Sequence, residues 1–285
     1  MMPAPDDLIA SYFTLSGAGV GQPAAHSFAD RIKAAAAAGY VGIGLTHEDY
    51  DRLVAGTPPS ELRAIADDHG VAIAEIEFLA GWASDGDLAA LSRTWEQRLY
   101  DMADVFGAHH MNVGIGDPPG SLPPLDAVAE RFAGVCDRAA EHGLLVAIEF
   151  MPFFAVGDAA TALAIATTAG RPNGGILLDC YHWFRGTPQP DAVRAAPDRV
   201  VAVQLDDVDA DVPADLIAET TTNRRLPGDG AQDVAGLLRL LADAGAEPAL
   251  SVEVLSTELW DLPVDESAQR SADAARAVIA RARRG

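Results

Sequence analysis

The sequence predicts a (β/α)8 TIM barrel that forms a single domain over residues 1–285. Short apolar runs alternate with helix-like segments, at about 30 to 35 residues for each pair, and no linker separates them. Several runs lack polar alternation, as expected of parallel strands that are buried on both faces. The chain length is also close to the roughly 250 residues typical of these barrels. An open doubly wound sheet is the alternative, but residues 16–21 only partly imitate its glycine-rich phosphate turn.

The first half of the chain predicts four pairs of a strand and a helix. Ser27 is a suitable N-cap for the first helix, and Gly39 lies where a helix can end in a left-handed residue. The third helix carries apolar residues at spacings of three and four, the pattern of one buried face. The expected strands are residues 9–15, 41–45, 71–78 and 110–114, and the expected helices are residues 27–38, 60–69, 87–106 and 125–142.

In the second half, four successive predicted strands each end in a side chain with an oxygen donor. One such residue alone is more often a helix cap or a solvated loop residue, but four in succession are harder to explain in that way. Active sites of this fold lie where the carboxyl ends of the strands meet. We therefore expect Glu149, Asp179, Gln204 and Glu253 to lie together. Their strands are residues 144–149, 175–179, 200–204 and 249–253, and the helices of this half are residues 158–169, 191–195, 234–244 and 265–283.

Composition and charge exclude several classes of function. A formal net charge of −22 would repel nucleic acids and anionic membranes over most of the surface. No run reaches the roughly 18 apolar residues of a membrane span, and the first residues lack the basic flank and apolar run of a signal peptide. Cys136 and Cys180 do not suggest a disulfide framework. These observations predict a cytoplasmic protein that acts on a small molecule.

The four strand-end residues form a shell of oxygen donors that suits one divalent cation. Mg²⁺ and Mn²⁺ prefer such ligands, and Zn²⁺ is less well suited. A cation of this kind can hold the carbonyl and hydroxyl oxygens of a polyol and stabilise an enediolate. Glu149 and Glu253 are the expected acid and base for proton transfer next to the carbonyl. His182 is expected to hold a substrate oxygen or to relay a proton.

Other residues near the strand ends are candidates for the walls of the pocket. Trp183 neighbours two expected site residues, so we expect it to form a flat wall against a sugar. His47 and Asn112 can line the pocket, as can Glu77 and Trp82, although each of these four can equally serve the fold alone.

A long polar insertion at residues 205–230 has the length of a lid over the barrel mouth. Its acidic residues 206–211 are expected to be solvated rather than to bind a second metal. Arg224 and Arg225 precede a Pro-Gly turn in a chain that has few cations. A guanidinium is a planar fork of donors, so we expect Arg224 to bind a polar or anionic end of the substrate.

These pieces together resemble the xylose isomerase-like TIM barrels, the sugar phosphate isomerase/epimerase superfamily. The resemblance covers nearly the whole chain, and its specific part is in the second half. It rests on Ile148-Glu149, Leu178-Asp179-Cys180-Tyr181-His182, Val203-Gln204-Leu205-Asp206, residues 224–230 and Val252-Glu253.

The resemblance implies that one divalent metal, often Mn²⁺, Mg²⁺ or Co²⁺, is bound by Glu149, Asp179, Gln204 and Glu253, with Zn²⁺ as a further alternative. It also implies that the two Glu serve as acid and base and that His182 and Arg224 contact the substrate. Many ketose epimerases have His where this chain has Gln204. Gln at this position is similar to hydroxypyruvate isomerases and to bacterial 3-dehydroshikimate dehydratases.

The leading hypothesis is a metal-dependent isomerase or epimerase of a small keto-sugar or keto-polyol, working through a metal-bound enediolate. The second is a lyase that abstracts the same proton and expels a β-oxygen, as a dehydratase of inosose or 3-dehydroshikimate type or by elimination from a 3-keto-glycoside. An endonuclease with this barrel would need several His ligands and a basic surface. A non-catalytic sugar-binding barrel is the fourth hypothesis. Barrels of this kind often pair, so a homo-oligomer and a monomer both stay open.

Overall fold

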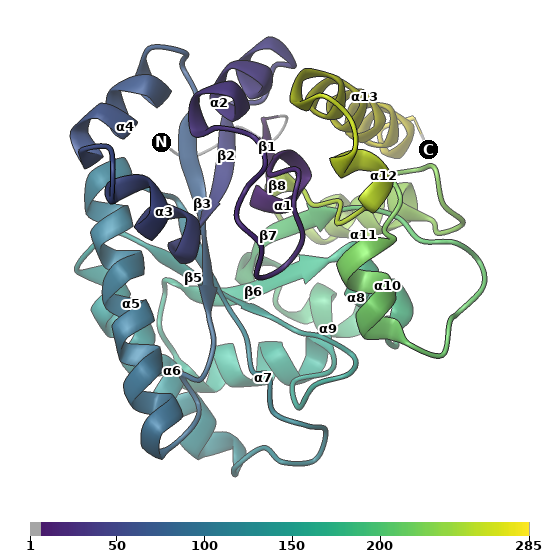
Figure 1. Ribbon diagram of the computed structural model, residues 1–285. Helices are drawn as coiled ribbons and strands as arrows, with labels where there is room; N and C mark the ends of the chain where they lie inside the picture. Colours follow the sequence, from purple (N-terminus) through teal and green to yellow (C-terminus); the bar gives the residue numbers. More distant parts are fainter. Residues whose placement is uncertain (1–6, 285) are drawn as a thin grey trace.

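The computed structural model describes residues 7–284, and these residues form a closed barrel of eight parallel strands in the order β1 to β8. β1 pairs with both β2 and β8, which closes the sheet. Figure 1 shows the strands at the centre with helices around them. This confirms the predicted (β/α)8 barrel and excludes the open sheet. The strands are β1 (Leu8–Ala10), β2 (Gly42–Thr46), β3 (Ala72–Leu79), β4 (His110–Val113), β5 (Leu145–Glu149), β6 (Gly174–Asp179), β7 (Val200–Leu205) and β8 (Ala249–Val252).

The helices begin and end largely where the sequence signals lie. The Ser27 side chain accepts a hydrogen bond from the Asp30 N–H, and Gly39 has a φ of +77°, as expected for the end of the first long helix. Within residues 7–284, no helix is both long and apolar enough to cross a membrane. The helices are α1 (Tyr12–Leu15), α2 (Phe28–Ala37), α3 (His47–Val54), α4 (Pro59–Asp67), α5 (Gly86–Phe106), α6 (Leu125–Ala140), α7 (Ala159–Ala169), α8 (Cys180–Arg185), α9 (Pro190–Ala195), α10 (Leu216–Thr222), α11 (Val234–Ala244), α12 (Thr257–Trp260) and α13 (Val264–Ala282).

The first predicted strand was too long. Only Leu8–Ala10 is a strand, and Tyr12–Leu15 forms the short helix α1. An apolar run of this length is compatible with either structure, so its periodicity alone cannot separate them. The chain leaves the sheet at Ser11, whose hydroxyl donates to Glu253 at 2.8 Å.

The insertion after β7 is an ordered part of the fold. Asp207 pairs with Arg225 through two backbone hydrogen bonds, and its carboxylate accepts from the backbone N–H groups of Val208, Gly228 and Gln232. One side chain thus joins both ends of this segment. The segment also contains α10, which the sequence analysis did not predict.

The interior of the barrel explains where the polar strand-end residues point. Small or apolar side chains from six strands form a separate buried cluster inside the sheet: Ile9, Ala74, Ala147, Leu177, Ala202 and Ala249. Side chains two residues apart on a strand face the same side. Glu149, Asp179 and Gln204 each follow a member of this cluster by two residues, so they face the interior at the carboxyl ends of β5, β6 and β7.

Candidate metal centre and active site

The structure brings the four predicted strand-end residues together at one end of the barrel. Asp179 of β6 lies opposite Gln204 of β7 in the strand register, and Glu253 follows β8 directly. The Gln204 amide donates to Glu253 Oε1 at 2.9 Å, and Ser11 donates to the same oxygen. Oxygens of Glu149 and Asp179 and a ring nitrogen of His182 lie within 4.8 Å of one another. All of these residues are buried.

Arg224 occupies the centre of this carboxylate group. Its Nη1 donates to Asp179 Oδ2 at 2.6 Å, to Asp206 Oδ2 at 2.7 Å and to Glu253 Oε2 at 3.0 Å. Its Nε and Nη2 donate to the backbone carbonyl and the hydroxyl of Thr220. The structure therefore places Arg224 in the site, as predicted, but its donors are directed at protein oxygens.

The single positive charge of Arg224 cannot balance the negative charges of the carboxyl groups around it. The pKa values of these groups reflect the missing positive charge. Burial raises the pKa of Glu149 to about 8, with a further contribution from Asp179. Burial also raises the pKa of Glu253 and of Asp206 well above their usual range, despite Arg224. Burial acts in the same direction on Asp179, but the charge of Arg224 outweighs it and holds the pKa of that carboxyl below its ordinary value. The site can therefore accept more positive charge.

The residues of the site fit a divalent cation. Gln204 Oε1 is fully buried and has no hydrogen-bond partner within residues 7–284, so this oxygen is available as a ligand. The other donors are carboxylate oxygens, which hard divalent cations prefer. Buried carboxylates with too little counter-charge are costly, and a cation would relieve that cost.

His182 lines the cavity beside Glu149. Its Nε2 is 3.3 Å from Glu149 Oε1, and its backbone N–H donates to Asp179 Oδ1 at 3.0 Å. Burial lowers the pKa of His182 to about 4, so the ring is neutral at pH 7. A neutral imidazole next to Glu149 can accept or donate one hydrogen bond without adding charge.

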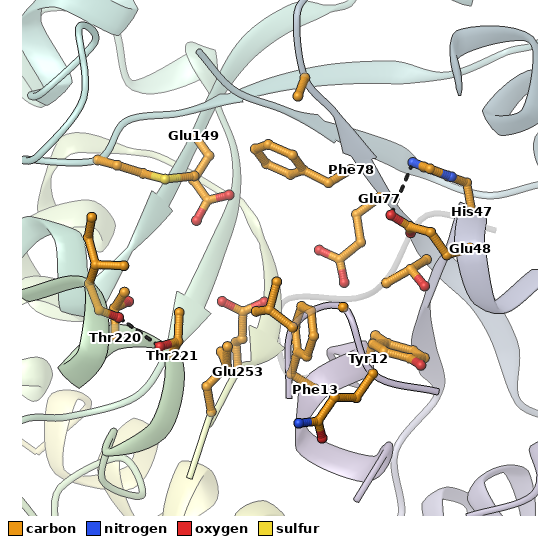
Figure 2. A pocket seen from close by; sticks show the side chains of 18 of the residues that line it. Tyr12, Phe13, His47, Glu48, Glu77, Phe78, Glu149, Thr220, Thr221 and Glu253 are labelled. Carbon is orange, nitrogen blue, oxygen red and sulfur yellow. Dashed lines mark hydrogen bonds and ion pairs between the residues drawn. The ribbon is translucent and has the colours of Figure 1, made fainter. Parts of the chain in front are cut away.

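A cavity of about 420 Å³ opens above these residues. Figure 2 shows Glu77, Glu149 and Glu253 pointing toward one another, with Phe13 and Phe78 beside them. His182 and Arg224 also line this cavity. A substrate at the inner end of the cavity would therefore lie beside Glu77, Glu149 and Glu253, with His182 and Arg224 also within the lining.

His47 lines the cavity, as the sequence analysis suggested. It begins α3, because the Thr46 side chain accepts from the Asp49 N–H and caps this helix. The His47 ring stacks on Trp95 at 5.7 Å between centroids, and its Nε2 is 3.6 Å from Glu48 Oε1. His47 thus contributes to the wall of the outer part of the cavity.

Two predicted pocket residues have other positions. Trp183 is 4% exposed, belongs to the main apolar core and is not among the described residues that line the cavity. It follows His182 in helix α8, so its side chain points in a different direction. Asn112 is fully buried below the cavity, where its amide donates to Glu77 Oε2 at 3.3 Å. The expected contacts of both residues with substrate are not present in this geometry.

Glu77 and Asp206 are both part of the site, although Asp206 was expected to be solvated and is fully buried. Glu77 lines the cavity and is 3% exposed, and Asp206 shares Nη1 of Arg224 with Asp179 and Glu253. The signal for Glu77 was available, because Glu75 and Glu77 alternate along an otherwise apolar strand and so face the same side. Two acidic residues in that pattern point into the barrel.

Comparison with known proteins identifies the family of this chain. The family described as xylose isomerase-like TIM barrel matches residues 32–279. The chain belongs to this family, which confirms the predicted resemblance.

Two curated relatives and one solved structure are representative. The inosose isomerase of Halalkalibacterium halodurans is 30% identical over 146 residues, which are 50% of this chain and 51% of that protein. The 3-dehydroshikimate dehydratase of Pseudomonas putida is 24% identical over 88% of this chain and 39% of that protein. The chain thus spans about half or less of the curated relatives it matches. A structure of the IOLI protein, described as having a bound zinc atom, has a TM-score of 0.84 at 18% identity and covers 96% of this chain and 98% of that one, which shows the shared fold.

Proposed function

We propose that this protein is a divalent-cation-dependent isomerase or epimerase of a keto-sugar or keto-polyol. The observation that carries the proposal is the convergence of Glu149 and Glu253 on one cavity, beside the unpartnered oxygen of Gln204. Relatives named inosose isomerase support a carbonyl-bearing polyol as the class of substrate. Glu149, Asp179, Gln204 and Glu253 would hold the cation. When bound, it would supply positive charge to the carbonyl oxygen of the substrate.

The side chains of the chain itself account for the proton transfer. One of the two glutamates removes a proton from the carbon next to the carbonyl, and the other returns a proton to the carbon skeleton. Proton transfer by a positioned carboxylate contributes about 100- to 10,000-fold to a rate. His182, neutral and 3.3 Å from Glu149, holds a substrate oxygen in place or passes the proton on.

A lyase is the second candidate, and Glu77 favours it. Expulsion of a β-oxygen requires a second acid near the leaving group. Glu77 lines the cavity, and burial, together with the nearby Glu75, raises its pKa well above its usual range, which favours its protonated form. The relatives named 3-dehydroshikimate dehydratase support the same reading.

Incubation in D2O distinguishes the candidates. The Mn²⁺-loaded protein is mixed with inosose, 3-dehydroshikimate or a ketose, and the product is analysed by mass spectrometry. Deuterium in a product of unchanged composition supports the isomerase, and loss of water or of an aglycone supports the lyase. Full activity of the metal-free protein would refute the requirement for a divalent cation. Unchanged turnover in Glu149→Gln and Glu253→Gln would support a binding protein without catalysis.

Two further expectations stay predictions. Both cysteines are free and buried, which is compatible with the expected reducing cytoplasm. A homo-oligomer is expected from the resemblance, and light scattering during size-exclusion chromatography measures it directly.

A further inference from the structure

The cavity has two chemically different ends. The inner end carries the carboxyl groups, His182 and Arg224. The outer end is formed by apolar side chains from several segments of the chain, which we call the apolar collar: Phe13, Val20, Phe78, Trp95, Met151, Phe153, Phe154, Ile217 and Leu255. Pockets for larger ligands have such walls, with a few polar groups that fix the orientation.

The aromatic residues of this protein are concentrated at the collar. Four of its nine phenylalanines line the cavity, although aromatic residues make up only 6% of the chain. These side chains are half-buried, so part of their surface faces the cavity. The Phe153 ring lies edge-on to His182 at 5.6 Å between centroids. The collar therefore begins directly beside the proposed reaction centre.

The outermost members of the collar are exposed. Val20 is 59% exposed and Ile217 is 51% exposed, and both line the cavity. Helix α10, which carries Ile217, is fixed from outside: Tyr181 donates to the carbonyl of Leu216 at 2.8 Å, and Arg185 Nε donates to Glu219 at 2.7 Å. Ile217 is thus held at the rim of the cavity by a fixed helix. A small polyol at the inner end would leave these apolar walls facing water.

The inner end is built for an uncharged group. Each nitrogen of the Arg224 guanidinium already donates to a protein oxygen. Three carboxyl groups line the same space. Among the described cavity-lining residues, the other arginine is Arg52, which is exposed at the outer rim. A carboxylate or phosphate placed next to the glutamates, away from the proposed metal, would meet repulsion, and the described residues of the inner end offer it no side-chain cation with free donors.

We infer that the substrate is an uncharged keto-sugar or keto-polyol joined to an apolar ring, and that the collar binds this ring. The inference rests on the proposed function for the position of the polyol. A volume of about 420 Å³ has room for both parts, since pockets for drug-sized ligands measure about 300 to 1,000 Å³. Aromatic walls favour a ring because they bury its surface and stack against its faces and edges.

Binding without turnover tests the inference. The Mn²⁺-loaded full chain is titrated calorimetrically with methyl β-D-glucopyranoside, phenyl β-D-glucopyranoside and phenyl β-D-glucuronide as stable probes. We expect the phenyl glucoside to bind at least about tenfold more tightly than the methyl glucoside, because burial of one ring has an effect of this size. The glucuronide should bind at least about tenfold more weakly than the phenyl glucoside, because its carboxylate enters the acidic end.

Variants show where the ring binds. Ile217→Ser and Phe153→Ala should each reduce the preference for phenyl over methyl, and Ile217→Ser changes an exposed side chain, so it should fold normally. Leu125→Ser, an exposed apolar residue at the start of α6, is the matched control and should retain the preference. Equal affinities for phenyl and methyl, or a preference that survives both variants, would overturn the collar. Equal affinities for glucoside and glucuronide would overturn the uncharged substrate.

The inference and the proposed function can fail separately. If deuterium exchanges into a ketose but the phenyl probe is not preferred, the proposed isomerase function stands and ring binding by the collar is refuted. If the phenyl probe is preferred and this preference depends on Ile217, but no deuterium is exchanged, ring binding by the collar stands and the isomerase function is refuted.

Discussion

The two halves of the barrel contribute to the cavity in different ways. Strands β5 to β8 end in Glu149, Asp179, Gln204 and Glu253, which form one buried polar group around Arg224. Strands β1 to β4 and the segments after them contribute mainly walls, including Phe78, Trp95 and His47. The larger charged group therefore lies on one side of the barrel, and Glu48 and Glu77 are the acidic residues that the other side adds to the cavity.

The polar residues inside the first half are bound to each other. Glu75 Oε2 is 3.3 Å from His110 Nε2, and Asn112 donates to Glu77. Glu75 Oε1 and Glu77 Oε1 nevertheless have no hydrogen-bond partner within residues 7–284. In the second half, Asp179 and Glu253 both accept from Arg224 and from further donors. The difference teaches that one arginine organises the strand-end carboxylates of the second half, whereas Glu75 and Glu77 depend on an imidazole and an amide.

Substitution of the glutamates should have the largest effect and should separate the two halves. Glu149→Gln and Glu253→Gln should each slow deuterium exchange by about 100- to 10,000-fold, because they remove the proton-transferring groups. Glu77→Gln should slow it by less than about tenfold, because Gln imitates the protonated carboxyl that its raised pKa implies. The rates are measured by mass spectrometry in D2O.

Glu247→Gln, at an exposed position outside the cavity, is the control for these variants. A large loss of exchange in Glu77→Gln would contradict the proposed difference between the halves. It would also favour the lyase.

Arg224 should matter more for stability than its neighbour Arg225. Arg224→Met leaves Asp179, Asp206 and Glu253 buried without their cation, and removal of one partner of a buried pair costs about 3 to 5 kcal/mol. Arg225 is half-buried and pairs with the exposed Asp209, so Arg225→Met should cost about 0 to 1 kcal/mol. Urea unfolding of metal-free protein measures both. Equal losses would show that the carboxylates do not depend on the Arg224 charge.

The pH dependence of stability should show the raised pKa of Glu149. Its folded-state pKa, about 8, exceeds the ordinary value of 4.5, so this group stabilises the fold fully below about pH 4.5, and the contribution is lost as the pH rises to about 8. His182, with its pKa lowered to about 4 from 6.5, acts in the opposite direction between these two values. The lowered pKa of Asp179 matters only at more acidic pH.

The clear window is therefore about pH 6.5 to 8. In this window, the free energy of unfolding of the unchanged protein should fall as the pH rises. In Glu149→Gln it should fall less steeply. Added Mn²⁺ should also make the free energy of unfolding fall less steeply with pH, because its charge balances the ionised carboxylate. Urea unfolding at several pH values measures these slopes, and parallel curves for the two proteins would exclude the raised pKa.

The smallest expected effect is a change of metal preference. Gln204→His replaces an oxygen donor with an imidazole nitrogen, which suits Zn²⁺ better than Mg²⁺ or Mn²⁺. The ratio of Zn²⁺ to Mn²⁺ affinity should rise by about tenfold, within the range that changes near a metal produce. Competitive calorimetric titration measures the ratio. An unchanged ratio would show that Gln204 is not a ligand.

Much of the fold and the position of the charged group were predictable from the sequence. Strands buried on both faces are continuous apolar runs, and a residue such as Asp179 at the end of such a run has to face the barrel mouth. The helix boundary at Gly39 was readable for a similarly local reason.

Features that depend on contacts between distant segments were not predictable. Tyr12–Leu15 is apolar enough for a strand, but the strand ends at Ala10, the last residue in register with β8. Trp183 was assigned to the cavity from its neighbours, but the direction of α8 places it in the core. The collar combines α1, α5, α10 and the segment after β5, so no local pattern shows it.

The carboxylate of Asp207 has a consequence for engineering. Because it accepts from Val208, Gly228 and Gln232, the start and the end of the insertion are fixed by one side chain. A loop transplanted from a relative would have to include both Asp207 and the turn at residues 228–232. Within these anchors, α10 and the residues before it could be exchanged to change specificity, provided that the replacement keeps a hydroxyl residue at Thr220, which accepts from Arg224.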